Sequence, residues 1–217
     1  MIKAVIFDMD GLMIDTEKLL LRYWLEAAHH YGYAMRQEHA LGIRSLAAKY
    51  AIPKLKSQLG EDFDYQKVRA LRMKLMNEHI ETYGLEEKPG LGLLLEYLKE
   101  HQYKTAVATA TDLERTKRYL GSLDRLTYFD QIVCAPMVAN GKPAPDIYLE
   151  AAARLETDPC QCMALEDSPN GIMAAYRAGM RAVMVPDLSG PDADTEKLLY
   201  RCVKDLSEVI SVLEEDR

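Results

Sequence analysis

The chain has 217 residues, of which 48% are hydrophobic, and this length suits one large domain or a core with a smaller inserted unit. Its 27 basic and 34 acidic residues give a net charge of -7, which disfavours a general nucleic-acid binder and fits an acidic globular protein. The apolar run before Asp8 is too brief for a signal peptide, and no apolar stretch is long enough to span a membrane. We therefore expect a cytoplasmic protein with neither a nucleic-acid nor a membrane partner.

Five short apolar runs follow one another along the chain, each with the length and composition of a buried strand. They cover residues 4–7, 105–108, 131–135, 162–165 and 182–185. Helical patterns lie between them, as at residues 91–98, where four leucines share one helix face. Alternating strands and helices predict an α/β fold built on a parallel sheet with right-handed crossovers.

The interval between the first two runs is far longer than an ordinary crossover and has helical character. Turns are expected near Gly32, Gly42, Pro53 and Gly60. We interpret the interval as an inserted helical cap, with edges near Thr16 and near Lys88-Pro89-Gly90, where proline and glycine could act as hinges. The expected domains are an α/β core, residues 1–15 and 88–217, and a helical cap, residues 16–87.

Asp8 and Asp10 are the most informative residues, because the two carboxylates stand where the first apolar run ends. Side chains alternate along an extended segment, so these two project to the same side and can bracket one reacting group. One can attack while the other transfers protons, and Gly11 lets the strand open into a loop where a backbone carbonyl can approach a metal. The same pattern also occurs in plain turns, which is the alternative interpretation of the pair alone.

The second run ends in Thr109, Ala110 and Thr111 and is followed by a helix signal. A hydroxyl and backbone N–H groups beside a helix N-terminus form an anion site, so we expect Thr109 to hold a phosphate oxygen rather than only to end the strand. For Thr111 we favour the plainer interpretation that it caps the helix. Thr111-Asp112-Leu113-Glu114 has the form of a capping box.

Two further segments place charged groups at turns or strand ends. Lys142 stands between a glycine and a proline, so turn chemistry fixes its backbone, and its ammonium suits a phosphate or a nucleophilic aspartate. Glu166 and Asp167 form a second acidic strand end. Mg²⁺ prefers hard oxygen ligands and usually takes one or two carboxylates, which Asp8 and Asp167 would supply. Taken alone, Glu166 and Asp167 are equally well explained as favourable charges at a helix N-terminus.

Together these residues resemble the four motifs of the haloacid dehalogenase-like hydrolases, in the family's order. The motifs are Asp8-Met9-Asp10-Gly11 with Asp15-Thr16-Glu17, then Thr109, Lys142 in its Gly-Lys-Pro frame, and Glu166-Asp167. The match is most similar to the branch with phosphoglycolate phosphatase-like and β-phosphoglucomutase-like members. The resemblance implies a Rossmann-like α/β core with a helical cap inserted after the first strand and a site at the carboxyl ends of the strands.

The resemblance also implies how the site works. Asp8 would attack phosphorus to give an aspartyl-phosphate, while Asp10 would protonate the leaving alkoxide and then activate the hydrolytic water. Mg²⁺ is the implied cofactor, and its expected ligands are Asp8, Asp10 and Asp167, with Glu166 behind them. The groups expected to disperse the charge of the transferring phosphoryl group are Thr109, the Ala110 N–H and Lys142.

Three functions fit this pattern. A phosphatase acting on a small phosphorylated metabolite is favoured, because the dehalogenases and phosphonatases of the family lack an aspartate at the position of Asp10. A β-phosphoglucomutase-like phosphomutase is the nearest alternative, but those enzymes carry a histidine where this sequence has Leu20. A catalytically inactive binding or regulatory protein is the third, and the intact acidic motifs argue against it. Because each site is built within one chain, we expect a monomer.

The expected cap is basic although the protein is acidic. Between residues 31 and 80, nine Lys and Arg outnumber five Asp and Glu. We interpret most of these residues as solvated helix faces, with a basic lid over an anionic substrate as the alternative. Arg44 is the favoured substrate contact in this set, and Trp24 is assigned to packing between helices.

Overall fold

The computed structural model describes residues 1–216 and contains one sheet of six parallel strands. The strands are β1 Ala4–Phe7, β2 Lys104–Thr109, β3 Gln131–Cys134, β4 Cys162–Glu166, β5 Arg181–Met184 and β6 Arg201–Cys202. Their order is β3-β2-β1-β4-β5-β6, so β1 and β4 lie in the centre. The predicted parallel α/β fold and its five strands are confirmed. The short β6 was not predicted, because its two exposed residues form no apolar run.

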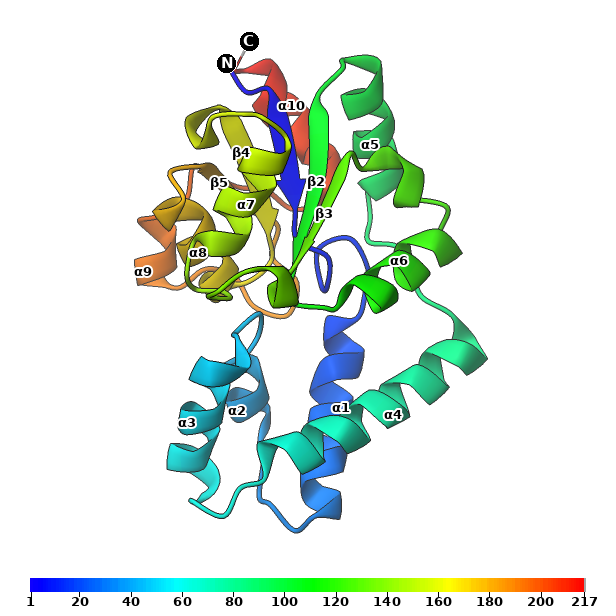
Figure 1. Ribbon diagram of the computed structural model, residues 1–217, viewed down its shortest axis with the longest axis vertical. Coiled ribbons are helices and arrows are strands. Elements are labelled where there is room, and N and C mark those ends of the chain that lie inside the picture. The colour runs from blue at the N-terminus through cyan, green and yellow to red at the C-terminus, as the bar shows by residue number, and fades with distance from the viewer. Residues whose placement is uncertain (217) are drawn as a thin grey trace.

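Alternate residues of β1 face opposite sides of the sheet and build two separate cores. Val5 and Phe7 pack with α5 (Leu91–Glu100), α6 (Leu113–Ser122) and α10 (Val209–Glu214). Ala4 and Ile6 pack with α7 (Asp146–Arg154) and α8 (Pro169–Arg177), and α9 (Ala193–Glu196) lies beside α8. Short 3-10 helices cover Leu126–Tyr128, Ala135–Met137, Pro159–Gln161 and Leu206–Glu208. Figure 1 shows the sheet between these helices.

Four helices stand apart from the sheet, where the inserted cap was expected (Figure 1). They are α1 Glu17–His30, α2 Gln37–Leu41, α3 Ala48–Leu59 and α4 Tyr65–Tyr83. These helices have a hydrophobic cluster of their own, which includes Trp24, Leu55 and Val68, so Trp24 packs between helices as predicted. We call α1 to α4 the cap helices, and the domain boundaries proposed from the sequence stay a prediction.

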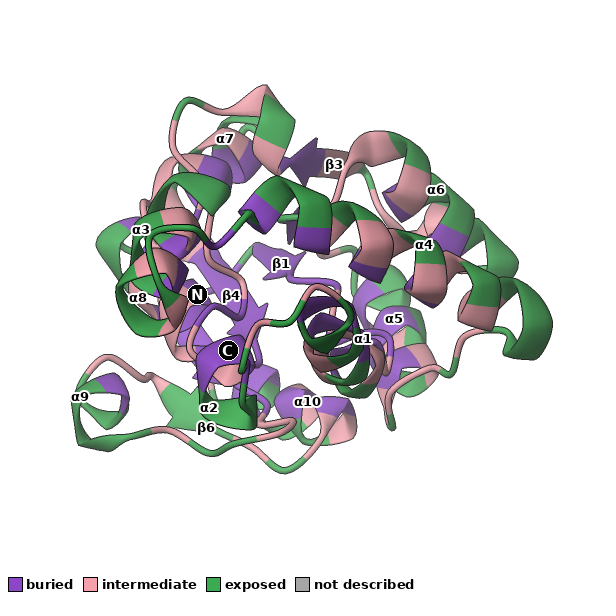
Figure 2. Ribbon diagram, turned by 90° about the horizontal axis from the view of Figure 1, so that it is seen from below, coloured by how far each residue is buried: buried purple, intermediate pink, exposed green. Residues whose placement is uncertain are grey.

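The carboxyl ends of the parallel strands meet at the edge of the sheet that faces the cap helices (Figure 1). Figure 2 looks toward that edge and shows buried residues in the central strands β1 and β4 and exposed residues on the outer helix surfaces. The loops that follow the strands therefore lie between the sheet and the cap helices, which is where parallel α/β sheets bind their ligands. Among residues 1–216, no helix has both the length and the apolar character needed to cross a membrane.

Candidate active site

Asp8 continues directly from β1 and is almost completely buried at the sheet edge. Its backbone N–H donates to the Leu165 carbonyl at 3.0 Å, which ties the start of the loop to β4. Gly11 then turns the chain with φ +84°, and a Cβ there would lie 2.4 Å from Asp167 Oδ2. Only glycine allows both this backbone angle and this close approach, so Gly11 brings the loop against the second acidic strand end.

Lys142 is buried and joins three parts of the core through its ammonium group. Its Nζ donates to Asp8 Oδ1 at 2.5 Å, to Glu166 Oε1 at 2.6 Å and to the Ala108 carbonyl at 3.0 Å. Burial alone lowers the pKa of a lysine, but the facing charges of Asp8 and Glu166 outweigh it and raise the pKa of Lys142. The residue is therefore held as a cation beside Asp8, and its expected contact with phosphate stays a prediction.

Glu166 has both carboxylate oxygens occupied by partners within the protein. Oε1 also accepts from the Tyr148 hydroxyl at 2.6 Å, and Oε2 accepts from Ser168 Oγ at 3.3 Å. Gly171 makes room for it, because a Cβ at that position would lie only 1.9 to 2.1 Å from the Glu166 carboxylate atoms. Glu166 therefore fixes the position of Lys142. Tyr148 was not foreseen, because it reaches the site from the interior face of α7.

Asp8, Glu166 and Asp167 form an acidic cluster in which one ligand atom from each lies within 4.8 Å of the others. Asp8 Oδ2 and Asp167 Oδ1 are buried and have no hydrogen-bond partner among the described residues. Burial raises the pKa of Asp8 well above its ordinary value against the opposing Lys142 ammonium, and the other two carboxylates raise it further. Two unpaired, buried oxygens in an all-oxygen donor set fit a hard divalent cation, so the acidic cluster could hold a metal ion.

Asp10 lies beside the acidic cluster with its carboxylate held by two threonines. Its Oδ1 accepts from Thr16 Oγ1 at 2.7 Å, and its Oδ2 accepts from Thr111 Oγ1 at 2.8 Å. The residue is partly exposed and lines the cavity described below. The Asp10 carboxylate contacts these threonines and is not part of the acidic cluster, so its role as a metal ligand stays a prediction.

Thr111 is a site residue that the sequence interpretation missed. The N-cap of α6 is Asp112, whose carboxylate accepts from the Arg115 N–H at 2.9 Å, so the interpretation of Thr111 as the helix cap was wrong. The hydroxyl of Thr111 is instead directed to Asp10. The missed signal was the competing Asp112, a strong N-cap residue one position later. Thr109 is fully buried and its Oγ1 accepts from the Thr111 N–H at 3.1 Å, so its predicted contact with phosphate stays a prediction.

Arg44 reaches from the loop between α2 and α3 into the core. Its guanidinium pairs with Glu17 at 3.2 Å between Nε and Oε2, and a second nitrogen contacts the Asp167 carboxylate. Burial raises the pKa of Glu17 to about 8, although Arg44 opposes this shift. Arg44 was expected to bind substrate. The structure places it in the cavity wall with its charge already paired, and the substrate contact stays a prediction.

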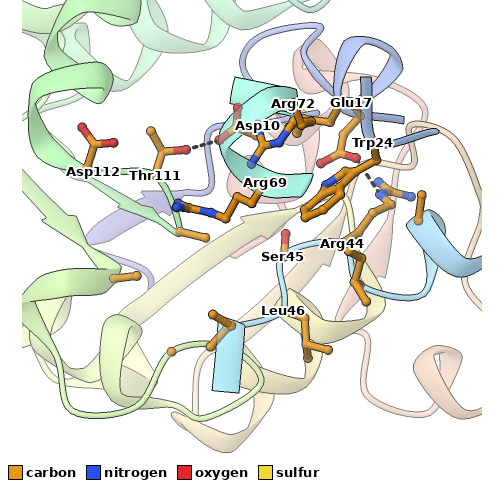
Figure 3. Close-up of a pocket in the computed structure, with 18 of the residues that line it drawn as sticks. Asp10, Glu17, Trp24, Arg44, Ser45, Leu46, Arg69, Arg72, Thr111 and Asp112 are labelled. Atoms are coloured by element: carbon orange, nitrogen blue, oxygen red, sulfur yellow. Dashed lines mark hydrogen bonds and ion pairs between the residues drawn. The ribbon is translucent and has the colours of Figure 1, made fainter. Parts of the chain in front are cut away.

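A cavity of about 490 Å³ lies between the strand ends and the cap helices. Its wall on the core side includes Asp8, Asp10, Ala110 and Thr111. Its wall on the cap side includes Leu20, Trp24, Arg44, Arg69 and Arg72, several of which are drawn in Figure 3. This volume is typical of a small-molecule site, and the carboxylates of Asp8 and Asp10 stand on one side of it.

The comparisons with known proteins agree with this fold. Residues 5–185 match the family model described as haloacid dehalogenase-like hydrolase. The match covers most of the chain, and the chain therefore belongs to the haloacid dehalogenase-like hydrolases. The family that the motifs indicated is thus confirmed.

Individual relatives span nearly the whole chain. A phosphorylated carbohydrates phosphatase of Thermotoga maritima is 33% identical over 215 residues, which cover 98% of this chain and 99% of the relative. A β-phosphoglucomutase of Bacillus subtilis is 30% identical over 191 residues, which cover 84% of this chain and 83% of the relative. The solved structure of CbbY from Rhodobacter sphaeroides in complex with phosphate is 26% identical, with a TM-score of 0.78 and 96% of each chain covered.

Proposed function

We propose that this chain is a Mg²⁺-dependent phosphatase that hydrolyses a small phosphorylated metabolite through an aspartyl-phosphate at Asp8. The observation that carries the proposal is the environment of Asp8, which lies at the cavity with one oxygen held by Lys142 and the other buried and unpaired. The Lys142 ammonium fixes the carboxylate at the cavity for attack on the substrate, and the unpaired oxygen is left for a metal ion. The named activity of the Thermotoga maritima relative supports the same reaction.

In the first half of the reaction, a carboxylate oxygen of Asp8 forms a bond to phosphorus while the bond from phosphorus to the alcohol oxygen breaks. Asp10 donates a proton to that oxygen, so the product leaves as a neutral alcohol. The hydrogen bonds from Thr16 and Thr111 fix the Asp10 carboxyl group at the cavity, which positions it for this transfer. Lys142 balances the negative charge that gathers around Asp8.

In the second half, a water molecule attacks phosphorus and the bond between phosphorus and the Asp8 oxygen breaks. Asp10, now a carboxylate, takes the proton from this water. Inorganic phosphate leaves, and Asp8 returns to its starting carboxylate form. One aspartate thus carries the phosphoryl group while the other carries the proton, which requires both side chains to lie at one cavity, as they do.

The unpaired oxygens of Asp8 and Asp167 are the groups that would hold Mg²⁺. When bound, the ion would stabilise negative charge on the transferring phosphoryl group. Glu166 would remain a neighbour rather than a ligand, because its oxygens already accept hydrogen bonds from Lys142, Tyr148 and Ser168.

Hydrolysis is favoured over phosphomutase chemistry by Leu20. This residue stands where β-phosphoglucomutases carry a histidine, and its apolar side chain lines the cavity. A leucine cannot donate or accept a proton, so the cap offers no acid or base at this position. The substrate class that the relatives indicate is a phosphorylated sugar or sugar alcohol, since the Thermotoga maritima relative is named for phosphorylated carbohydrates.

The test is a turnover assay with Mg²⁺ on p-nitrophenyl phosphate and a panel of sugar phosphates. Wild type should release phosphate and chelation of Mg²⁺ should stop it, while Asp8→Asn should lose at least about a thousandfold in kcat. Asp194→Asn is the matched control, because this aspartate is highly exposed on α9 and should keep normal turnover. Isomerisation of β-glucose 1-phosphate with a bisphosphate activator would favour the mutase, and no turnover of any phosphate ester would revive the inactive alternative.

A further inference from the structure

One face of α4 presents arginines to the cavity. Arg69, Arg72 and Met76 are spaced three and four residues apart, so they share one side of the helix, and all three line the cavity. The opposite wall includes Arg115 from α6, four residues before Tyr119 on the same helix face. Figure 3 shows Arg69 and Arg72 among the cavity side chains together with Asp10 and Thr111 of the core. We call Arg69, Arg72 and Arg115 the arginine cluster.

Arg72 is a buried cation without an anionic partner. Its exposed fraction is 7%, and no carboxylate of residues 1–216 forms an ion pair with it. Its guanidinium lies 5.2 Å from the centre of the Trp24 ring and 3.8 Å from the Met76 sulfur, and its Nε has no hydrogen-bond partner. Burial, together with the nearby charges of Arg69 and Arg115, lowers the pKa of Arg72 to about 10. The expectation of a solvated helix face was therefore wrong for this residue.

The neighbours of Arg72 are also short of partners. Arg69 is half-buried, and it forms no ion pair or hydrogen bond with the described part of the chain. Arg115 has one carboxylate nearby, that of Asp112 at 3.4 Å. The Tyr119 side chain is also buried at the cavity, and the Arg118 guanidinium lies over the face of its ring. Within residues 1–216, Arg69 and Arg72 on the α4 side of the cavity thus have no anionic partner.

The acidic residues that line the cavity form no ion pair with Arg69 or Arg72, and only Asp112 pairs with Arg115 among the described residues. Asp10 already accepts from Thr16 and Thr111, and Glu17 is paired with Arg44. A buried guanidinium without a counter-charge is costly, so its place in a cavity wall points to an anion that arrives from outside the chain. Guanidinium groups suit phosphate and carboxylate in particular, because their planar N–H groups match two anion oxygens at once.

We propose that the arginine cluster binds a second anionic group of the substrate, a phosphate or a carboxylate, remote from the phosphate that Asp8 attacks. This inference rests on the proposed phosphatase function and narrows its substrates to metabolites with two anionic groups, such as a sugar bisphosphate or a phosphorylated acid. Arg69 and Arg72 come from the cap and Arg115 from the core, so the second anion would also join the two walls of the cavity. Binding energy from this remote group would then align the reacting phosphate with Asp8.

The test compares matched substrates that differ in one anionic group. Fructose 1-phosphate is paired with fructose 1,6-bisphosphate, and ethyl phosphate is paired with phosphoglycolate. Wild type should prefer the doubly anionic member of at least one pair in kcat/KM by about tenfold or more, as expected for a charged hydrogen bond. The first pair reports a second phosphate and the second pair reports a carboxylate.

Arg69→Met should reduce this preference by about tenfold, because Arg69 has no protein partner whose loss would disturb the fold. Arg72→Met should do the same, and its nearly matched volume keeps contact with Trp24. Lys74→Met is the control, because this lysine is on the same helix with a side chain that is 71% exposed, and the preference should not change. A purely structural arginine would lower activity on both members of a pair equally and leave their ratio unchanged.

A binding arm separates this inference from the proposed function. Asp8→Asn and Asp8→Asn with Arg69→Met are titrated calorimetrically with each doubly anionic compound, and the second variant should bind at least about tenfold more weakly. Hydrolysis of monophosphates with no preference in either pair and no effect of Arg69 on binding would overturn the inference and leave the phosphatase intact. Arg69-dependent binding without turnover of any ester would support the anion site and overturn the proposed function.

Discussion

Arg44, which the loop between two cap helices carries, forms an ion pair with Asp167 at the end of β4 in the core. Asp167 is fully buried and Arg44 nearly so, and the same arginine also pairs with Glu17. Asp167 is also one of the two residues with an unpaired oxygen in the acidic cluster. A guanidinium and a metal ion on this carboxylate would each weaken the other's binding, so Arg44 would couple the cap helices to a metal ion held by the acidic cluster.

Arg44→Gln should separate the contribution of Arg44 to stability from its competition with a metal ion. Without Mg²⁺ the variant should lose about 3 kcal/mol in free energy of unfolding, because the buried contacts of Arg44 with Asp167 and Glu17 are lost. With saturating Mg²⁺ the variant should gain more stability than wild type, because the ion then faces no competing cation. Urea denaturation with and without Mg²⁺ measures both quantities.

The control for this variant is Arg36→Gln. Arg36 pairs with Glu38 at the surface, where both side chains are more than half exposed, and its loss should change stability by less than about 0.5 kcal/mol. If Mg²⁺ stabilises Arg44→Gln and wild type equally, Arg44 and the metal site are not coupled.

Thr111→Val should slow turnover without a comparable change in KM. The variant keeps the shape of the side chain but removes the hydrogen bond that fixes Asp10 Oδ2. A hydrogen bond to a charged group contributes about 1.5 to 3 kcal/mol, so kcat should fall about 10- to 100-fold. Steady-state kinetics on one sugar phosphate measure this change. Thr157→Val, which removes a bond to the Leu155 carbonyl far from the cavity, should keep kcat, and an equal loss in both variants would speak against a role in the site.

Gly171→Ala should disturb the contact between Glu166 and Lys142. The added Cβ would meet the Glu166 carboxylate at about 2 Å, so Glu166 must move and its contact with Lys142 must change. We expect a loss of about 1 to 3 kcal/mol in the free energy of unfolding and a lower kcat. Gly121→Ala in α6 meets open space and should be neutral or stabilising by up to about 1 kcal/mol. Chemical denaturation and kinetics on both variants check this, and an unaffected Gly171→Ala would show that Glu166 has room to move.

Glu17 should make stability depend on pH. Its pKa rises from the ordinary value of 4.5 to about 8 in the folded protein, so the folded state binds more protons than the unfolded state between these values. The stabilisation from the protonated form is therefore complete below pH 4.5 and is lost as the pH rises to about 8, by up to about 1.4 kcal/mol per pH unit. The advantage of Glu17→Gln over wild type should grow across this range in denaturation experiments. Parallel profiles would contradict the assignment.

Much of the fold and of the acidic cluster follows from local sequence pattern. The apolar run before Asp8 and the runs that end at Thr109 and Glu166 are strands, and strands of a parallel sheet bring their carboxyl ends to one edge. The parallel sheet alone therefore predicts that residues far apart in the chain, such as Asp8 and Asp167, lie close together. The motif residues allowed this prediction because each one lies at the end of a strand or in a turn.

The contacts that were missed are those decided by tertiary packing. Tyr148 reaches Glu166 from the interior face of α7, and its place in the sequence pattern indicates only an ordinary core residue. Arg72 belongs to a set of basic residues of which most were interpreted as solvated helix faces, because a helical charge pattern does not reveal which face packs against a neighbouring helix. Thr111 was misassigned because two adjacent residues, Thr111 and Asp112, could both cap α6 by their chemistry, and only the backbone geometry selects one.

The most direct test of Asp8 as the nucleophile is to trap the phosphoryl group on the protein. Wild type is mixed with a radiolabelled phosphate ester and Mg²⁺, quenched in acid within one turnover, digested and mapped by mass spectrometry. We expect label on the peptide that contains Asp8, and none in Asp8→Asn. Turnover without a labelled protein, or label at any residue other than Asp8, would contradict it.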